Sequence, residues 1–120
     1  MEVDIDFVYK KLIEQGGPAA HQTPQGQVVC QYRADDDRKC AAGWLIPDNL
    51  YHRNMEGCDA TAFAVCEALK SIGYNDRDLE LIRLMQCAHD TAARNYFMDP
   101  TTNWEHHLKN AWTFSDLGYA

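Results

Sequence analysis

The segment from Val28 to Gly57 constrains the fold of this 120-residue chain more than any other part of the sequence. Its first residues alternate in polarity, with Val28, Cys30 and Tyr32 on one face, and a period of two is typical of a half-buried strand. The residues around Asp35–Asp37 favour a turn, because aspartate side chains bond nearby backbone amides. This pattern predicts an antiparallel hairpin whose tip is acidic.

The predicted return strand ends at Pro47, whose nitrogen has no hydrogen to donate to a neighbouring strand. Its alternating apolar positions are Cys40, Ala42, Trp44 and Ile46. If Arg33 pairs with Lys39, the thiols of Cys30 and Cys40 lie on the same face of the hairpin. A two-stranded hairpin is marginally stable alone, so we expect helices to cover one of its faces.

Helical spacing of apolar residues and helix-capping signals predict the rest of the chain. The expected helices are Asp4–Gln15, a short one at Asp48–Met55, Ala60–Ile72 capped by Asp59, Arg77–Tyr96, and one that opens at the capping box Thr102–Glu105. The broad apolar face of the fourth indicates a central helix contacted from two sides. The predicted fold class is α+β and mostly helical, with one two-stranded antiparallel hairpin packed against four to five helices in a single domain, 1–120.

The charge of the chain points to a protein partner. The formal net charge is −7, and direct binding to nucleic acid depends on clustered Lys and Arg. No apolar run approaches the ~20 residues that span a bilayer, so no membrane contact is expected. The acidic start of the chain does not resemble a signal peptide. We therefore expect a cytoplasmic protein that binds a basic protein, through a surface that imitates nucleic acid or through acids alone.

The cysteines are predicted to be reduced and mostly buried. There are five of them, and none forms a CxxC pair. Cys30, Cys40, Cys58 and His52 can be brought together by the hairpin, but the short spacings of a structural zinc site are missing. The sequence therefore predicts neither a metal nor another cofactor, and whether these four side chains meet stays open.

A catalytic thiol would need a nearby base, and His89 is the best placed histidine, with Cys66 or Cys87 as its partner. His89 lies at the edge of the apolar face of its helix, where a histidine is usually a core residue bonded to a carbonyl. Asp90 is expected to point elsewhere, because adjacent helical residues do not face each other. No catalytic residue is therefore assigned.

The candidate contact residues are Asp35, Asp36, Asp37 and Arg38, at the tip of the predicted hairpin. Three adjacent acids can attract a divalent cation, but the spacing of a calcium loop is absent. Acids also lie near the starts of the first and fourth predicted helices, such as Asp76, Asp78 and Glu80. Together with the turn they can build a negative field. Loops on a rigid scaffold commonly carry recognition, so this turn is the predicted partner-binding site.

One string of residues resembles small uncharacterised proteins encoded by bacteriophages and prophages. It comprises Cys30-x-Tyr32-Arg33, then Lys39-Cys40-Ala41-x-Gly43-x-Leu45-Ile46-Pro47-Asp48, Tyr51 and Met55-Glu56-Gly57. The later Leu84-x-Gln86-x-x-His89-Asp90 and the Trp104 helix are similar as well. The resemblance carries no catalytic residues. It implies an accessory gene of a phage whose product works in the host cytoplasm.

The leading hypothesis is therefore a small acidic phage protein, not an enzyme, that binds and inhibits or modulates a host protein. Its target would belong to a defence system, as for an anti-CRISPR protein, or to a nucleic-acid-handling system. One alternative is a small Cys/His zinc protein or hydrolase built around Cys30, Cys40, Cys58 and His89. Another is a self-associating module with an apolar patch of Trp112, Phe114 and Tyr119. Trp44 and Trp104 are predicted core residues, and the oligomeric state is left open.

Overall fold

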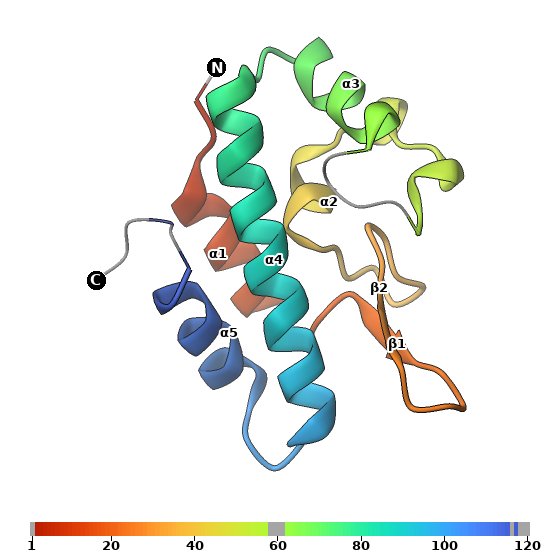
Figure 1. The fold of residues 1–120 in the computed structure, drawn as a ribbon, viewed down its shortest axis with the longest axis vertical. Coiled ribbons are helices and arrows are strands. Elements are labelled where there is room, and N and C mark those ends of the chain that lie inside the picture. The colour runs from red at the N-terminus through yellow and green to blue at the C-terminus, as the bar shows by residue number, and fades with distance from the viewer. Residues whose placement is uncertain (1, 58–61, 116, 118–120) are drawn as a thin grey trace.

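The protein is mostly helical with one small antiparallel sheet, which confirms the predicted α+β class (Figure 1). The computed structural model describes residues 2–57, 62–115 and 117. Its elements are α1 (Ile5–Glu14), β1 (Ala20–Gln22), β2 (Val28–Cys30), α2 (Ala41–Leu45), the 3₁₀ turns η1 (Asp48–Leu50) and η2 (Arg53–Met55), α3 (Phe63–Ser71), α4 (Asp76–Met98) and α5 (Trp104–Thr113).

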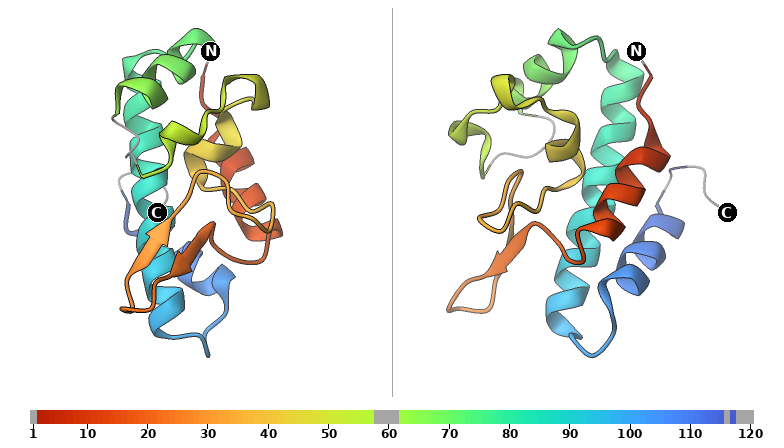
Figure 2. Two further views of the ribbon diagram at one scale, coloured as in Figure 1. Left: turned by 90° about the vertical axis from the view of Figure 1, so that its right-hand side faces the viewer. Right: turned by 180° about the vertical axis from the view of Figure 1, so that it is seen from behind.

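Helix α4 is the central element, as its broad apolar face predicts. It contacts α5 along one side and α2 and β2 along another, and α1 packs against α2 and α5 (Figure 1). Seen from behind, α1 and α5 lie side by side (Figure 2). The core between these helices contains Leu12, Ile82, Met85, Leu108 and Trp112, each at most 1% exposed.

The helix ends follow the capping rules. Asn75 opens α4 with a capping box, in which the Asp78 backbone N–H donates to Asn75 and the Asn75 N–H donates to the Asp78 carboxylate. Asp78 is only 5% exposed and also accepts from the Val3 N–H at 3.4 Å, so it is not part of an exposed acidic field as predicted. At α5 the cap is Asn103, which accepts from the His106 N–H, so the helix does not open at the capping box predicted at Thr102–Glu105. Asp59, the predicted cap of α3, lies outside the described residues.

The hairpin lies one segment earlier in the chain than predicted. The polar connector Ala20–Gln22 forms β1, and its partner is Val28–Cys30, with Ala20 opposite Cys30. The predicted pairing across the acidic turn shrinks to a single bridge between Arg33 and Lys39. Strand β1 was missed because His21 and Gln22 are exposed, which removes the apolar alternation that marks a strand.

The predicted return strand is wrong, because Ala41–Leu45 forms helix α2. Cys40 is the N-cap, and its sulfur accepts from the Gly43 N–H at 3.4 Å. Gly43 lies so close to the Tyr32 carbonyl that an added Cβ would overlap its oxygen. The predicted short helix at 48–55 is likewise two 3₁₀ turns, because Tyr51 and His52 between them are extended.

The two tryptophans predicted to be core residues differ. Trp104 is 3% exposed and donates its indole N–H to the Leu12 carbonyl at 2.7 Å, which joins α5 to α1. Trp44 is half-buried on α2 and donates to the Gln15 side chain at 3.1 Å, so it is not a core residue. Burial of the cysteines is also lower than predicted: of the four described, Cys40 is buried, Cys30 and Cys66 are intermediate and Cys87 is exposed, and none of these four forms a disulfide.

Candidate functional site

The acidic turn is exposed and has a defined backbone. Asp35, Asp36 and Asp37 are all exposed, as predicted. The Ala34 N–H donates to the Arg38 carbonyl at 2.9 Å, and the Asp37 N–H donates back to the Ala34 carbonyl at 3.2 Å. Asp37 has a φ of 66°, a left-handed conformation that aspartate tolerates better than most residues. The turn therefore presents three carboxylates on a closed loop.

Arg38 connects this turn to the end of α1. Its Nε donates to the Gln15 carbonyl at 3.2 Å and lies 3.5 Å from the Asp36 carboxylate. The guanidinium covers Gly17 so closely that a Cβ there would overlap it. Arg38 is half-buried, so it supports the turn more than it extends the exposed surface. Within the described part of the chain, Asp35 and Asp37 form no ion pair.

The Gln15 amide fixes the other arm of the turn. Its Nε2 donates to the carbonyls of Gly17 and Lys39, both at 2.9 Å, and its Oε1 accepts from the Lys39 N–H at 3.0 Å. One side chain thus pairs with both backbone groups of Lys39, as a neighbouring strand would. The sequence contains no motif that predicts this role, because Gln15 and Lys39 are 24 positions apart.

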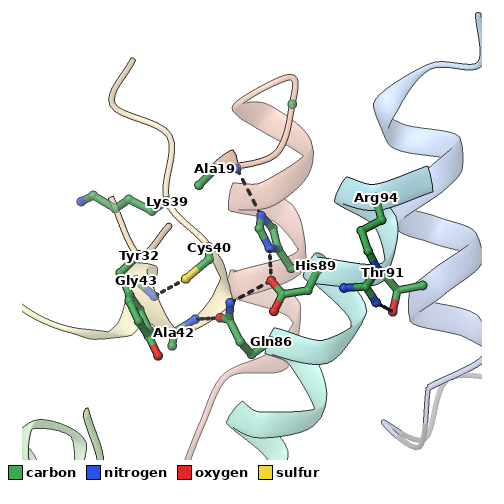
Figure 3. Close-up of polar contacts among 12 residues, drawn as sticks. Ala19, Tyr32, Lys39, Cys40, Ala42, Gly43, Gln86, His89, Thr91 and Arg94 are labelled. Carbon is green, nitrogen blue, oxygen red and sulfur yellow. Dashed lines mark hydrogen bonds and ion pairs between the residues drawn. The ribbon is translucent and has the colours of Figure 1, made fainter. Parts of the chain in front are cut away.

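A second candidate site is a polar cluster between β2 and α4, and Figure 3 shows its His89 together with the neighbouring Gln86. It brings the Cys30 thiol, the His89 ring and the Asp90 carboxylate together, with ligating atoms within 4.8 Å of one another. His89 is fully buried, and its Nδ1 lies 2.9 Å from Asp90 Oδ1. The expectation that Asp90 points away from His89 is therefore wrong. Gln86 also donates to Asp90 Oδ1, at 3.1 Å, and accepts from the Ala42 N–H at 3.0 Å.

The hydrogen bonds of His89 determine its tautomer. Its Nε2 lies 3.2 Å from the Ala19 N–H, and a backbone N–H can only donate (Figure 3). Nε2 is therefore unprotonated, and the proton of the neutral ring is on Nδ1, where it is donated to Asp90. Both ring nitrogens therefore form hydrogen bonds with other residues of the protein. His89 is a core residue as predicted, although its partners are a backbone amide and a carboxylate in place of a carbonyl.

The thiols near this cluster are held in the protonated form. Burial raises the pKa of Cys30 well above its ordinary value, and the charge and hydrogen bond of Asp90 raise this pKa further. Burial raises the pKa of Cys40 to about 12, even though the Gly43 N–H that donates to it acts in the opposite direction. A nucleophilic cysteine requires the thiolate. The surroundings of Cys30 and Cys40 therefore suppress the reactive form.

The grouping of ligands differs from the one considered from sequence. Among the described residues, Cys30 joins His89 and Asp90, whereas Cys40 and His52 are outside that group and Cys58 is not described. A zinc ion bound at His89 Nδ1 would move the ring proton to Nε2, facing the Ala19 N–H. The Cys, His and Asp atoms are suitable ligands. The hydrogen-bond pattern around them is that of a structural network.

A third polar group lies in the loop after α2, around the carboxylate of Glu56. It accepts from the Tyr32 N–H at 2.9 Å, the Arg33 N–H at 3.1 Å and the Tyr51 hydroxyl at 2.6 Å. Burial, followed by this bond to Glu56, raises the pKa of Tyr51 to about 12. The Arg33 guanidinium lies 4.5 Å from the centre of the Tyr51 ring and pairs with Asp48 at 2.6 Å. These residues hold the loop against β2.

The predicted apolar patch at the C-terminal end is not formed as expected. Trp112 is 1% exposed and stacks edge-on against Tyr9 at 5.2 Å between ring centres. Phe114 is 83% exposed, and Tyr119 lies outside the described residues. Trp112 therefore belongs to the core, and the self-associating module loses the largest of its three side chains.

Comparison with known proteins adds no assignment. No helix among the described residues combines the length and the apolar character needed to cross a bilayer. The family models, the curated proteins and the solved structures contain no match to this chain.

Proposed function

We propose that this chain is a small acidic accessory protein of a bacteriophage that acts in the host cytoplasm by binding a host protein and inhibiting or modulating it. The target belongs to a defence system or to a nucleic-acid-handling system, whose surfaces are commonly basic. The protein works without catalysis, and its primary contact is the acidic turn Asp35–Asp37.

The observation that carries this proposal is the combination of exposure and order at that turn. Three adjacent carboxylates are exposed, and the backbone beneath them is closed by two hydrogen bonds and joined to α1 through Arg38. A turn that is already ordered loses little conformational entropy when it binds. The formal charge of −7 adds long-range attraction for a basic surface.

The experiment is an affinity pull-down from bacterial lysate followed by binding kinetics on the captured protein at two ionic strengths. The test variant replaces Asp35, Asp36 and Asp37 with Asn, which retains the shape of the turn. We expect slower association and a weaker salt dependence, with an unchanged melting temperature, because exposed charges act mainly on the association rate.

A matched control removes the same charge elsewhere. Glu14, Glu67 and Glu105 are exposed, and their replacement by Gln changes the net charge equally. The control should retain most of the association rate. If both triple variants slow association by the same factor, only net charge matters. If neither changes it, the acidic turn is not the contact.

The cluster of Cys30, His89 and Asp90 favours one other candidate, a zinc protein or Cys/His hydrolase. Two observations weigh against it. Both ring nitrogens of His89 already form hydrogen bonds within the protein, and the pKa of the Cys30 thiol is raised. We expect elemental analysis of protein purified without chelators to find no stoichiometric zinc. One zinc per chain that is lost in a Cys30→Ser variant would promote this candidate above the binding protein.

A further inference from the structure

A basic and aromatic patch lies next to the acidic turn. It consists of Phe7 and Lys11 on α1, Lys39 in the bridge after the turn, and Trp44 on α2. The Lys11 ammonium is 5.7 Å from the centre of the Phe7 ring and 5.4 Å from that of Trp44. The Lys39 ammonium is 4.8 Å from the centre of Trp44. Two cations from separate parts of the chain thus share one indole ring.

These two lysines have no acidic partner within the described chain, although Asp and Glu number 18 against 11 Lys and Arg. Other cations do form ion pairs, such as Arg83 with Glu80 at 2.6 Å and Lys70 with Asp76 at 3.6 Å. The patch therefore brings together two lysines that form no ion pair with a described acid, on an acidic protein.

The patch is also ordered before any partner arrives. The Gln15 amide bonds both backbone groups of Lys39 and accepts from the Trp44 indole N–H at 3.1 Å. Attraction to the aromatic rings limits the freedom of the two ammonium groups. Phe7 is 41% exposed, which leaves an apolar surface beside the cations.

We propose that this patch binds an acidic segment of a protein partner, with its carboxylates on Lys11 and Lys39 and an apolar side chain on Phe7. The inference rests on the proposed binding function and adds a second contact of opposite charge to the acidic turn. A protein segment fits better than a nucleic acid, because the patch offers two lysines, whereas affinity for a phosphate backbone depends on many clustered Lys and Arg. The Trp44 ring is also already in contact with lysines, whereas base stacking requires an open ring.

The test measures binding of three labelled probes by fluorescence anisotropy. They are a glutamate-rich peptide with one Phe, the same peptide with Gln in place of every Glu, and an oligothymidylate of similar length. The test variant is Lys11→Gln with Lys39→Gln. Its control is Lys70→Gln with Lys109→Gln, which removes the same charge from exposed positions on α3 and α5. Melting temperatures verify that each variant is folded.

We expect the wild type to prefer the glutamate peptide over both other probes, and the test variant to lose at least tenfold in affinity while the control loses less than threefold. Equal losses in the two variants, preferential binding of oligothymidylate, or no binding of the glutamate peptide at millimolar concentration would each overturn the assignment. Failure here, with the Asp35–Asp37 variant still slowing association with the captured partner, would remove the patch and leave the proposed function standing.

Discussion

Cys40 shows how one residue combines a structural role with a protonation state. Its sulfur accepts from the Gly43 N–H at the start of α2, and its side chain is completely buried. Burial raises the pKa of this thiol to about 12, from an ordinary value near 9. Between these values an unfolded chain releases the proton and the folded protein retains it. Rising pH therefore favours the unfolded state across this window.

A Cys40→Ser variant isolates this contribution, because serine can cap the helix and does not ionise in that range. We expect the melting temperature of the wild type to fall more steeply than that of the variant between pH 9 and 12, with similar values below pH 8. Thermal unfolding followed by circular dichroism at several pH values is the measurement. Parallel curves over the whole range would show that Cys40 does not contribute to alkaline unfolding.

His89 shows which properties of a single residue can be predicted from the sequence. Its position on α4 predicts burial, and it is buried. Its contact with Asp90 was not predicted, because adjacent helical side chains normally diverge and only the Nδ1 geometry reveals the bond. The Ala19 N–H that determines its tautomer is 70 positions away, and no local pattern encodes such a contact.

Secondary-structure elements are likewise predictable only where their signals lie within the element itself. Helices α1, α4 and α5 were predicted because each has regular apolar spacing and a capping residue within its own sequence, such as Asp4 or Asn75. Helix α2 was mistaken for a strand because its five residues are too few to distinguish a period of 2 from one of 3.6. The pairing of Glu56 with the Tyr32 and Arg33 amides depends on loop geometry, and no sequence pattern predicts it.

Gly43 is the residue on which the position of α2 depends. We expect Gly43→Ala to lower the free energy of unfolding by roughly 1–3 kcal/mol, because the new Cβ overlaps the fixed Tyr32 carbonyl oxygen. Gly17→Ala is the matched control, since its Cβ meets the end of the Arg38 side chain and no backbone atom. Urea unfolding of both variants is the measurement. A loss at Gly17 as large as that at Gly43 would contradict the account of a backbone constraint.

The arrangement of the whole molecule depends on contacts between the first and last helices. Trp104 is buried and donates to the Leu12 carbonyl. We expect Trp104→Ala to cost roughly 3–5 kcal/mol of unfolding free energy. Trp104→Phe retains most of the ring and removes the donor, so it should cost less. Chemical denaturation of both variants separates the contribution of the buried ring from that of the hydrogen bond. A Trp104→Ala variant as stable as the wild type would show that α5 is dispensable to the core.

Helix α1 and the residues on either side of it are joined to distant parts of the chain by the Val3–Asp78, Ala19–His89 and Trp104–Leu12 hydrogen bonds. On a ribosome, α1 is made before its partners: α2 begins at Ala41, and α5 begins at Trp104, 90 positions after the last residue of α1. At 5–20 residues per second this delay is roughly 5–20 s. During that time α2 can cover part of α1, but the side of α1 that packs against α5 has no native partner. The side of α1 that faces α5 is therefore the last part of that helix to be covered during synthesis.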